Sequence, residues 1–159
     1  MKWVAIVLLV LALVLGGMIA YQALNTSLVV AGQGSQRVPA SDRAGEFAVL
    51  RTAVERGSVE GTVFISGELG DIADYAYEVY TLRLKNNGLI DAEMVEVQLA
   101  PLAGDALYYG ESGEVTIQKN GTRDIWVTVL TTGQKAARDV YVTYYLWGRP
   151  YRIKYTFNG

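Results

Sequence analysis

The stretch that decides the fold is VYTLRLKNNGLIDAEMVEVQL, from Val79 to Leu99. In its first half, apolar Tyr80, Leu82 and Leu84 alternate with more polar residues, which is the period-two pattern of a half-buried strand. The run Asn86-Asn87-Gly88 then supplies residues that tolerate the positive φ of a tight turn. Valines alternate again after it, as far as Leu99. The stretch therefore predicts a strand, a turn and a second strand.

Short alternating runs, each ended by turn residues, continue on both sides of this stretch. No window after residue 45 keeps helical spacing for three turns, so helix is expected only as a single turn within 71–77. Seven or eight strands at this spacing predict an all-β fold, an immunoglobulin-like β-sandwich over residues 46–159. The further candidate strands are 47–54, 59–66, 115–117, 125–129, 140–146 and 151–157.

An apolar segment precedes this domain. From Trp3 to Tyr21 the chain contains no charged residue, no proline and no amide side chain. A helix of that length rises roughly 30 Å, the thickness of the hydrocarbon core of a bilayer. We expect a single transmembrane helix over residues 1–24, with its two aromatic ends at the interfaces and its glycines suited to close helix packing. The expected anchor residues are Trp3, Leu9, Leu13, Gly16, Gly17 and Tyr21.

The same segment resembles a signal peptide less than a retained anchor. Its apolar run exceeds the usual 7–15 residues, and its small residues Ala20 and Ala23 do not have the spacing of an A-x-A cleavage site. No cysteine is present to carry a lipid. Lys2 precedes the segment and the next basic residue is Arg37, which predicts a cytoplasmic amino terminus and an exported domain in a single-pass protein of the cell membrane.

Residues 25–45 are expected to form a flexible linker. The segment contains glycines, a proline and several hydroxyl residues but no aromatic residue. Such a composition buries too little apolar area to offset the entropy of ordering.

The residue inventory argues against an enzyme. The chain has no histidine and no cysteine, which excludes Ser-His-Asp, Cys-His and histidine-metal sites. No S-x-x-K spacing occurs, and the acidic residues are scattered rather than paired. A net charge of −2 disfavours a nucleic-acid partner. We expect a non-catalytic protein without a cofactor.

One acidic loop, with Glu68, Asp71 and Asp74, allows two interpretations. Oxygen ligands could converge there on calcium, but the spacing matches no defined calcium loop. A connection kept soluble by its charges explains the residues more simply, so no metal site is expected.

Aromatic residues gather near the carboxyl end. If Val140, Val142, Tyr144 and Leu146 face the core, strand alternation places the intervening aromatic residues on the opposite face. Tyrosine and tryptophan there would offer flat apolar area with a polar handle to a glycan or a protein. A covered outer face is the alternative. The candidate binding residues are Tyr141, Tyr145, Trp147, Arg149 and Tyr151.

Three stretches carry a family resemblance: 80–99, VTIQKNGTRDIWVTV over 115–129 and DVYVTYYLWG over 139–148. Together they resemble the CARDB and FxLyD surface modules of bacteria and archaea, although the FxLyD signature itself is absent. The resemblance implies an immunoglobulin-like sandwich with an adhesive, scaffolding or spacer role. One helix followed by an exported sandwich is also similar to the accessory proteins of the archaellum.

Two functions follow as hypotheses. The chain is either a membrane-anchored extracytoplasmic module that binds a protein or a cell-wall polymer, or a structural subunit of a larger membrane or filament complex. In the second case the apolar helix is the interaction element.

Overall fold

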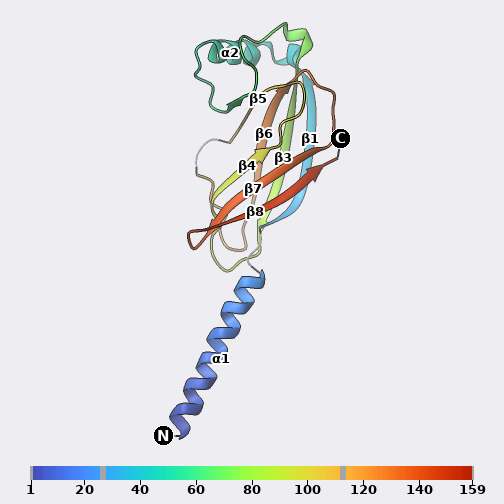
Figure 1. Cartoon of the computed structure of the whole chain (residues 1–159). Coiled ribbons are helices and arrows are strands. Elements are labelled where there is room, and N and C mark those ends of the chain that lie inside the picture. The colour runs from blue at the N-terminus through green and yellow to red at the C-terminus, as the bar shows by residue number, and fades with distance from the viewer. Residues whose placement is uncertain (1, 26–27, 112–113, 159) are drawn as a thin grey trace.

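The computed structural model describes residues 2–25, 28–111 and 114–158 and has two antiparallel sheets packed as a sandwich. The five-stranded sheet has the order β1-β3-β6-β5-β2 and the three-stranded sheet the order β4-β7-β8 (Figure 1). The helices are α1 (Lys2–Asn25) and α2 (Ala44–Glu55), with 3₁₀ turns η1 (Ala40–Arg43) and η2 (Ile72–Asp74). The strands are β1 (Leu28–Pro39), β2 (Thr62–Val63), β3 (Ala76–Asn86), β4 (Glu93–Leu99), β5 (Asp105–Gly110), β6 (Thr122–Thr131), β7 (Arg138–Leu146) and β8 (Arg149–Phe157).

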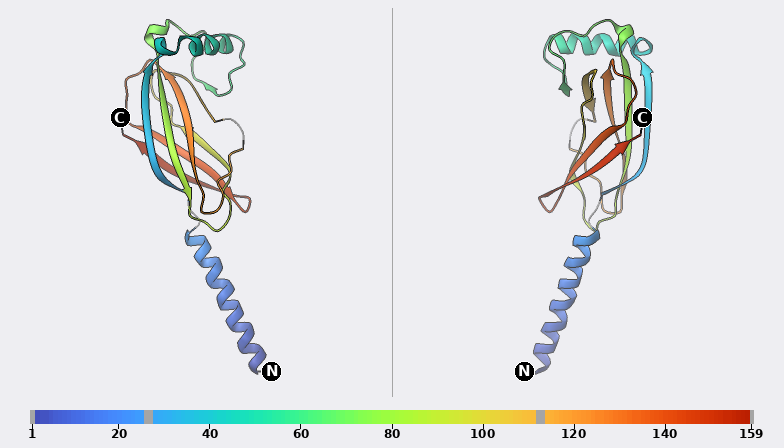
Figure 2. Two further views of the ribbon diagram at one scale, coloured as in Figure 1. Left: turned by 180° about the vertical axis from the view of Figure 1, so that it is seen from behind. Right: turned by 45° about the vertical axis from the view of Figure 1, so that its right-hand side comes forward.

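Helix α1 projects away from the sandwich (Figures 1 and 2). Its stretch Trp3–Tyr21 is long and apolar enough to cross a membrane, and none of it is buried against the rest of the chain. The predicted apolar helix is therefore confirmed. A membrane anchor and a signal sequence share these properties. Each predicted anchor residue lies exposed on α1: Trp3, Leu9, Leu13, Gly16, Gly17 and Tyr21.

The main core lies between the two sheets. Alternate residues of β3 and β6 point inward, such as Leu82 and Val127, and meet β7 residues such as Val142. The predicted inward set of β7 is confirmed in full. It consists of Val140, Val142, Tyr144 and Leu146, none more than 3% exposed.

A second core cluster lies under α2, on the outer face of the five-stranded sheet (Figure 2). Phe47 from α2 packs with Tyr77 of β3, Leu107 of β5 and Leu130 of β6, all nearly inaccessible to solvent. This helix therefore covers one end of the larger sheet and closes the sandwich at the end remote from α1.

The expected flexible linker over 25–45 is wrong, because most of this segment is ordered structure. Residues 28–39 form β1, which pairs antiparallel with β3 along its whole length. Backbone pairing needs no large side chains, and Gly32 lies at a register shift opposite Arg83. The rest of the segment continues into η1 and α2. Thr26 and Ser27 lie outside the described residues.

Three further expectations are corrected. Residues 47–54 form helix rather than strand, and 59–66 contains only the short strand β2. The expected strand 115–117 is only a single bridge, between Ile117 and Ala92. Strand β5 was not foreseen. The expected helical turn within 71–77 is confirmed as η2.

Candidate functional site

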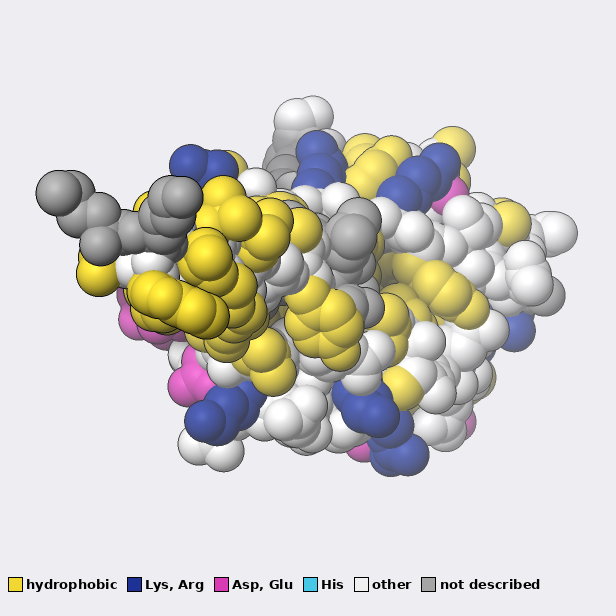
Figure 3. Space-filling view, turned by 90° about the horizontal axis from the view of Figure 1, so that it is seen from below, with side chains coloured by type: hydrophobic (Ala, Val, Ile, Leu, Met, Phe, Trp, Pro, Cys, Tyr) yellow, Lys and Arg dark blue, Asp and Glu magenta, His cyan; other side chains and the backbone are white. Residues whose placement is uncertain are grey.

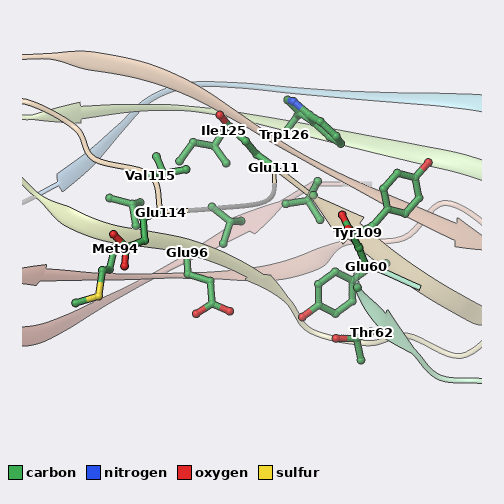
Figure 4. A pocket seen from close by; sticks show the side chains of 16 residues that line it. Glu60, Thr62, Met94, Glu96, Tyr109, Glu111, Glu114, Val115, Ile125 and Trp126 are labelled. Atoms are coloured by element: carbon green, nitrogen blue, oxygen red, sulfur yellow. The ribbon is translucent and has the colours of Figure 1, made fainter. Parts of the chain in front are cut away.

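A hollow lined by residues from both sheets lies at the open side of the sandwich, and we call it the acidic cleft. Its volume is about 540 Å³. Along this side, β4 ends the three-stranded sheet, while β2 covers β5 at only two positions, Thr62↔Tyr108 and Val63↔Leu107. The sheets therefore separate here, and side chains from both walls face the gap (Figure 4).

Carboxylates and apolar side chains share the lining. The four glutamates come from separate segments: Glu60 before β2, Glu96 on β4, and Glu111 and Glu114 after β5. Glu111 forms an ion pair with Arg123, and Glu96 accepts a 3.0 Å hydrogen bond from Gln98. The apolar lining includes Met94, Val97, Tyr108, Val115, Ile125 and Trp126.

A kink in β4 shapes one wall of this cleft. The pairing of β4 with β7 shifts register between Glu93 and Glu96, and Met94 adopts a positive φ of 48°. A non-glycine residue in that region is held there by its surroundings. Val95 turns toward the other wall, and its backbone N–H donates to Val115 at 2.8 Å. The kink leaves the Met94 side chain 43% exposed at the mouth of the cleft.

The cleft offers binding groups rather than a recognisable catalytic set. Its polar groups are carboxylates, one threonine and two tyrosines, and no residue of the chain is a histidine or a cysteine. Within 2–25, 28–111 and 114–158, no three acidic side chains converge closely enough to hold a metal ion. The acidic loop with Glu68, Asp71 and Asp74 contains η2. The Asp71 carboxylate accepts a 2.9 Å hydrogen bond from Ala73 N–H and so caps this turn.

The five predicted binding residues do not share one surface. Tyr141 and Tyr145 lie half-buried on the outer face of β7, as alternation predicts. Tyr151 lies on the inner side instead, where its ring stacks on Tyr144 with centroids 5.7 Å apart. Trp147 occupies the turn between β7 and β8, and Arg149 opposes Leu146 beside that turn.

The outer face of the three-stranded sheet is already engaged internally. The Arg152 guanidinium lies 4.1 Å from the centroid of the Tyr141 ring. The Lys154 ammonium lies 2.8 Å from Asp139 and holds the pKa of that carboxyl below its usual value. Arg152 thus covers Tyr141, which favours the interpretation of a covered face at that position.

A buried ionic network joins the two sheets at the end remote from α1. Arg138 of β7 donates to both carboxylate oxygens of Asp105 on β5, at 2.7 and 2.9 Å, and to the Tyr80 phenol at 3.2 Å. Tyr80 donates to Glu78 at 2.6 Å, and Arg37 donates to the other oxygen of Glu78 at 2.6 Å. Burial, and then the bond to Glu78, raises the pKa of Tyr80 to about 12. We call these five residues the distal network.

Neither the cleft nor the distal network is predicted from the sequence. Their members come from segments far apart in the chain, so no local spacing marks them. One residue pointed to the distal network in the sequence. Arg138 occupies the first inward position of a strand whose other inward residues are apolar.

Comparisons with known proteins assign no family. No family model and no curated protein matches the chain, so the resemblance to CARDB and FxLyD modules stays a prediction. Among solved structures, the chain is similar to a FixG-related protein from Vibrio parahaemolyticus, at 11% identity and a TM-score of 0.38. That match covers 82% of this chain and 96% of the other. Such a distant likeness transfers no function.

Proposed function

We propose that the chain is a membrane-anchored, non-catalytic module that binds a partner protein through the acidic cleft. In this proposal α1 is a retained single-pass anchor with its amino terminus in the cytoplasm. The immunoglobulin-like sandwich is then extracytoplasmic. The observation that carries the proposal is a 540 Å³ hollow with carboxylates on both walls at the free margin of a sheet.

The partner segment that fits the cleft is extended and basic. Beyond Val95, no described strand pairs with the open side of β4, so its backbone groups are available to an added strand. Among the described residues, Glu60, Glu96 and Glu114 form no ion pair, which leaves three carboxylates for lysine or arginine side chains. Met94 and Val97 offer apolar contacts alongside them.

The second function, a structural subunit held by its helix, rests on a different observation. Gly16 and Gly17 have open space around them on α1, so a neighbouring helix can approach the backbone closely. In that case the sandwich spaces the assembly and the cleft is dispensable.

Site-specific photo-crosslinking in the native membrane tests the two functions against each other. A photoreactive residue at Met94 should capture a partner, whereas one at Thr81, on the outer face of the five-stranded sheet, should not. The double substitution Glu96→Lys, Glu114→Lys should abolish capture from position 94 without changing thermal stability. Capture only from position 16 on α1, unaffected by that double substitution, would instead support the structural subunit.

A further inference from the structure

The end of the sandwich where β1 begins must lie next to the membrane if α1 is an anchor. Only Thr26 and Ser27 separate Asn25 of α1 from Leu28 of β1, so that gap spans at most roughly 11 Å. Leu28 pairs with Asn86, and a backbone hydrogen bond joins Leu28 to the Tyr144 phenol. The turns beyond Asn86 and Tyr144 therefore lie at this membrane-proximal end, as Figure 1 shows.

Two large apolar side chains project from turns at this end. Trp147 is 68% exposed and Leu89 is 48% exposed. Trp147 and Gly148 form the whole β7–β8 turn with φ of 51° and 70°, a geometry that favours Asn-Gly over a tryptophan. The loop that carries Leu89 is held in place by Asn86, whose side chain donates to Ile90 O at 2.8 Å.

Three basic side chains lie at this end, and Glu93, opposite Tyr145, is an exposed carboxylate there. Lys85, Lys119 and Arg149 are exposed and form no ion pair among the described residues, although the whole chain has a net charge of −2. The nearby Asp91 carboxylate is engaged locally, accepting a 2.8 Å bond from Lys119 N–H. Viewed from below, Lys and Arg ring this end, and acidic side chains show mainly at its margin (Figure 3).

We propose that the membrane-proximal end lies on the lipid surface, with Trp147 and Leu89 among the headgroups and the three basic side chains against lipid phosphates. The inference rests on the proposed function in one respect, the retention of α1 as an anchor. Tryptophan favours the interface because its ring is apolar and its N–H is polar. Lysine and arginine are attracted by anionic lipid. Because the tether already holds the domain at the surface, weak contacts suffice to orient it.

Three full-length variants, each with a single tryptophan, test the inference. In each variant the other two tryptophans are replaced by phenylalanine, which leaves Trp3, Trp126 or Trp147 as the reporter. Each variant is reconstituted into vesicles containing brominated lipid, which quenches fluorescence only at short range. Trp126 is the control, because it too is exposed, at 43%, but lies in mid-strand, four register positions from the proximal end of the β3–β6 pair.

We expect Trp3 and Trp147 to lose most of their emission in anionic vesicles and Trp126 to lose little. Quenching of Trp147 should fall in zwitterionic vesicles, at high salt, and in Lys119→Gln, Arg149→Gln protein. Quenched Trp3 with unquenched Trp147 would overturn the docking inference and leave the anchor intact. Unquenched Trp3 would overturn the anchor and, with it, both proposals.

Discussion

The two ends of the sandwich are closed in different ways. At the distal end, α2 packs over the larger sheet and the distal network joins both sheets. At the membrane-proximal end, strands stop in short turns whose apolar tips, Trp147 and Leu89, face outward. Protein atoms thus cover the distal end, whereas Trp147 and Leu89 stay exposed at the other end. Exposed apolar side chains on this fold therefore indicate a contact surface only at the proximal end, where no helix or network covers the strand ends.

The largest effect should come from breaking the distal network. Arg138 is 2% exposed and neutralises a carboxylate, Asp105, whose side chain is 1% exposed. Arg138→Ala leaves that carboxylate buried and unpaired, so the free energy of unfolding should fall by about 3–5 kcal/mol. Chemical denaturation in detergent measures the change. Arg83→Ala is the control. It removes the exposed ion pair with Asp124 and should leave the midpoint of chemical denaturation almost unchanged. Similar losses in both variants would contradict the structural role of the network.

A somewhat smaller effect should come from removing the packing of α2. Phe47 is 2% exposed, and its ring lies 5.5 Å from that of Tyr75, centroid to centroid. Phe47→Ala should lower the free energy of unfolding by about 3 kcal/mol because it leaves a cavity beneath the helix. Val49→Ala on the same helix is the control, since Val49 is 69% exposed and should matter by less than about 0.5 kcal/mol. Equal losses would mean that the helix is not docked as described.

The distal end also marks the limit of what the sequence predicts. Alternation over 79–85 and 140–146 identified the central strands, because one face of each is buried. Helix α2 was not predicted because its apolar stripe consists only of Phe47, Leu50 and Val54, over barely three turns. Strand β1 was not predicted because its stability comes from pairing with β3, and no local residue pattern indicates that pairing. The cleft and the distal network depend on the same long-range contacts.

A gain of stability is expected from one substitution at the proximal end. Trp147 holds φ at 51°, a region that costs most side chains about 1 kcal/mol or more and that asparagine tolerates. Trp147→Asn should therefore raise the free energy of unfolding in detergent by about 1 kcal/mol. In vesicles the same variant should lose its orientation on the lipid surface. A loss of stability in detergent would show that Trp147 stabilises the fold itself. Its presence in the strained turn would then not support a contact with lipid.

The smallest effect at neutral pH concerns the buried phenols, because their contribution to stability changes with pH only in alkali. Burial raises the pKa of Tyr77 and of Tyr80 to about 12, whereas a phenol in the unfolded chain titrates near 10. The folded state therefore holds these two protons more tightly. Their contribution to stability is complete below about pH 10 and is lost as the pH rises through about 12. The phenolate absorbance of the chain's eleven tyrosines should show a late step that coincides with the loss of circular dichroism. In Tyr80→Phe protein, stability should depend less steeply on pH within this window, since one of the coupled protons is gone. Complete ionisation of all tyrosines before any loss of secondary structure would contradict the burial of both phenols.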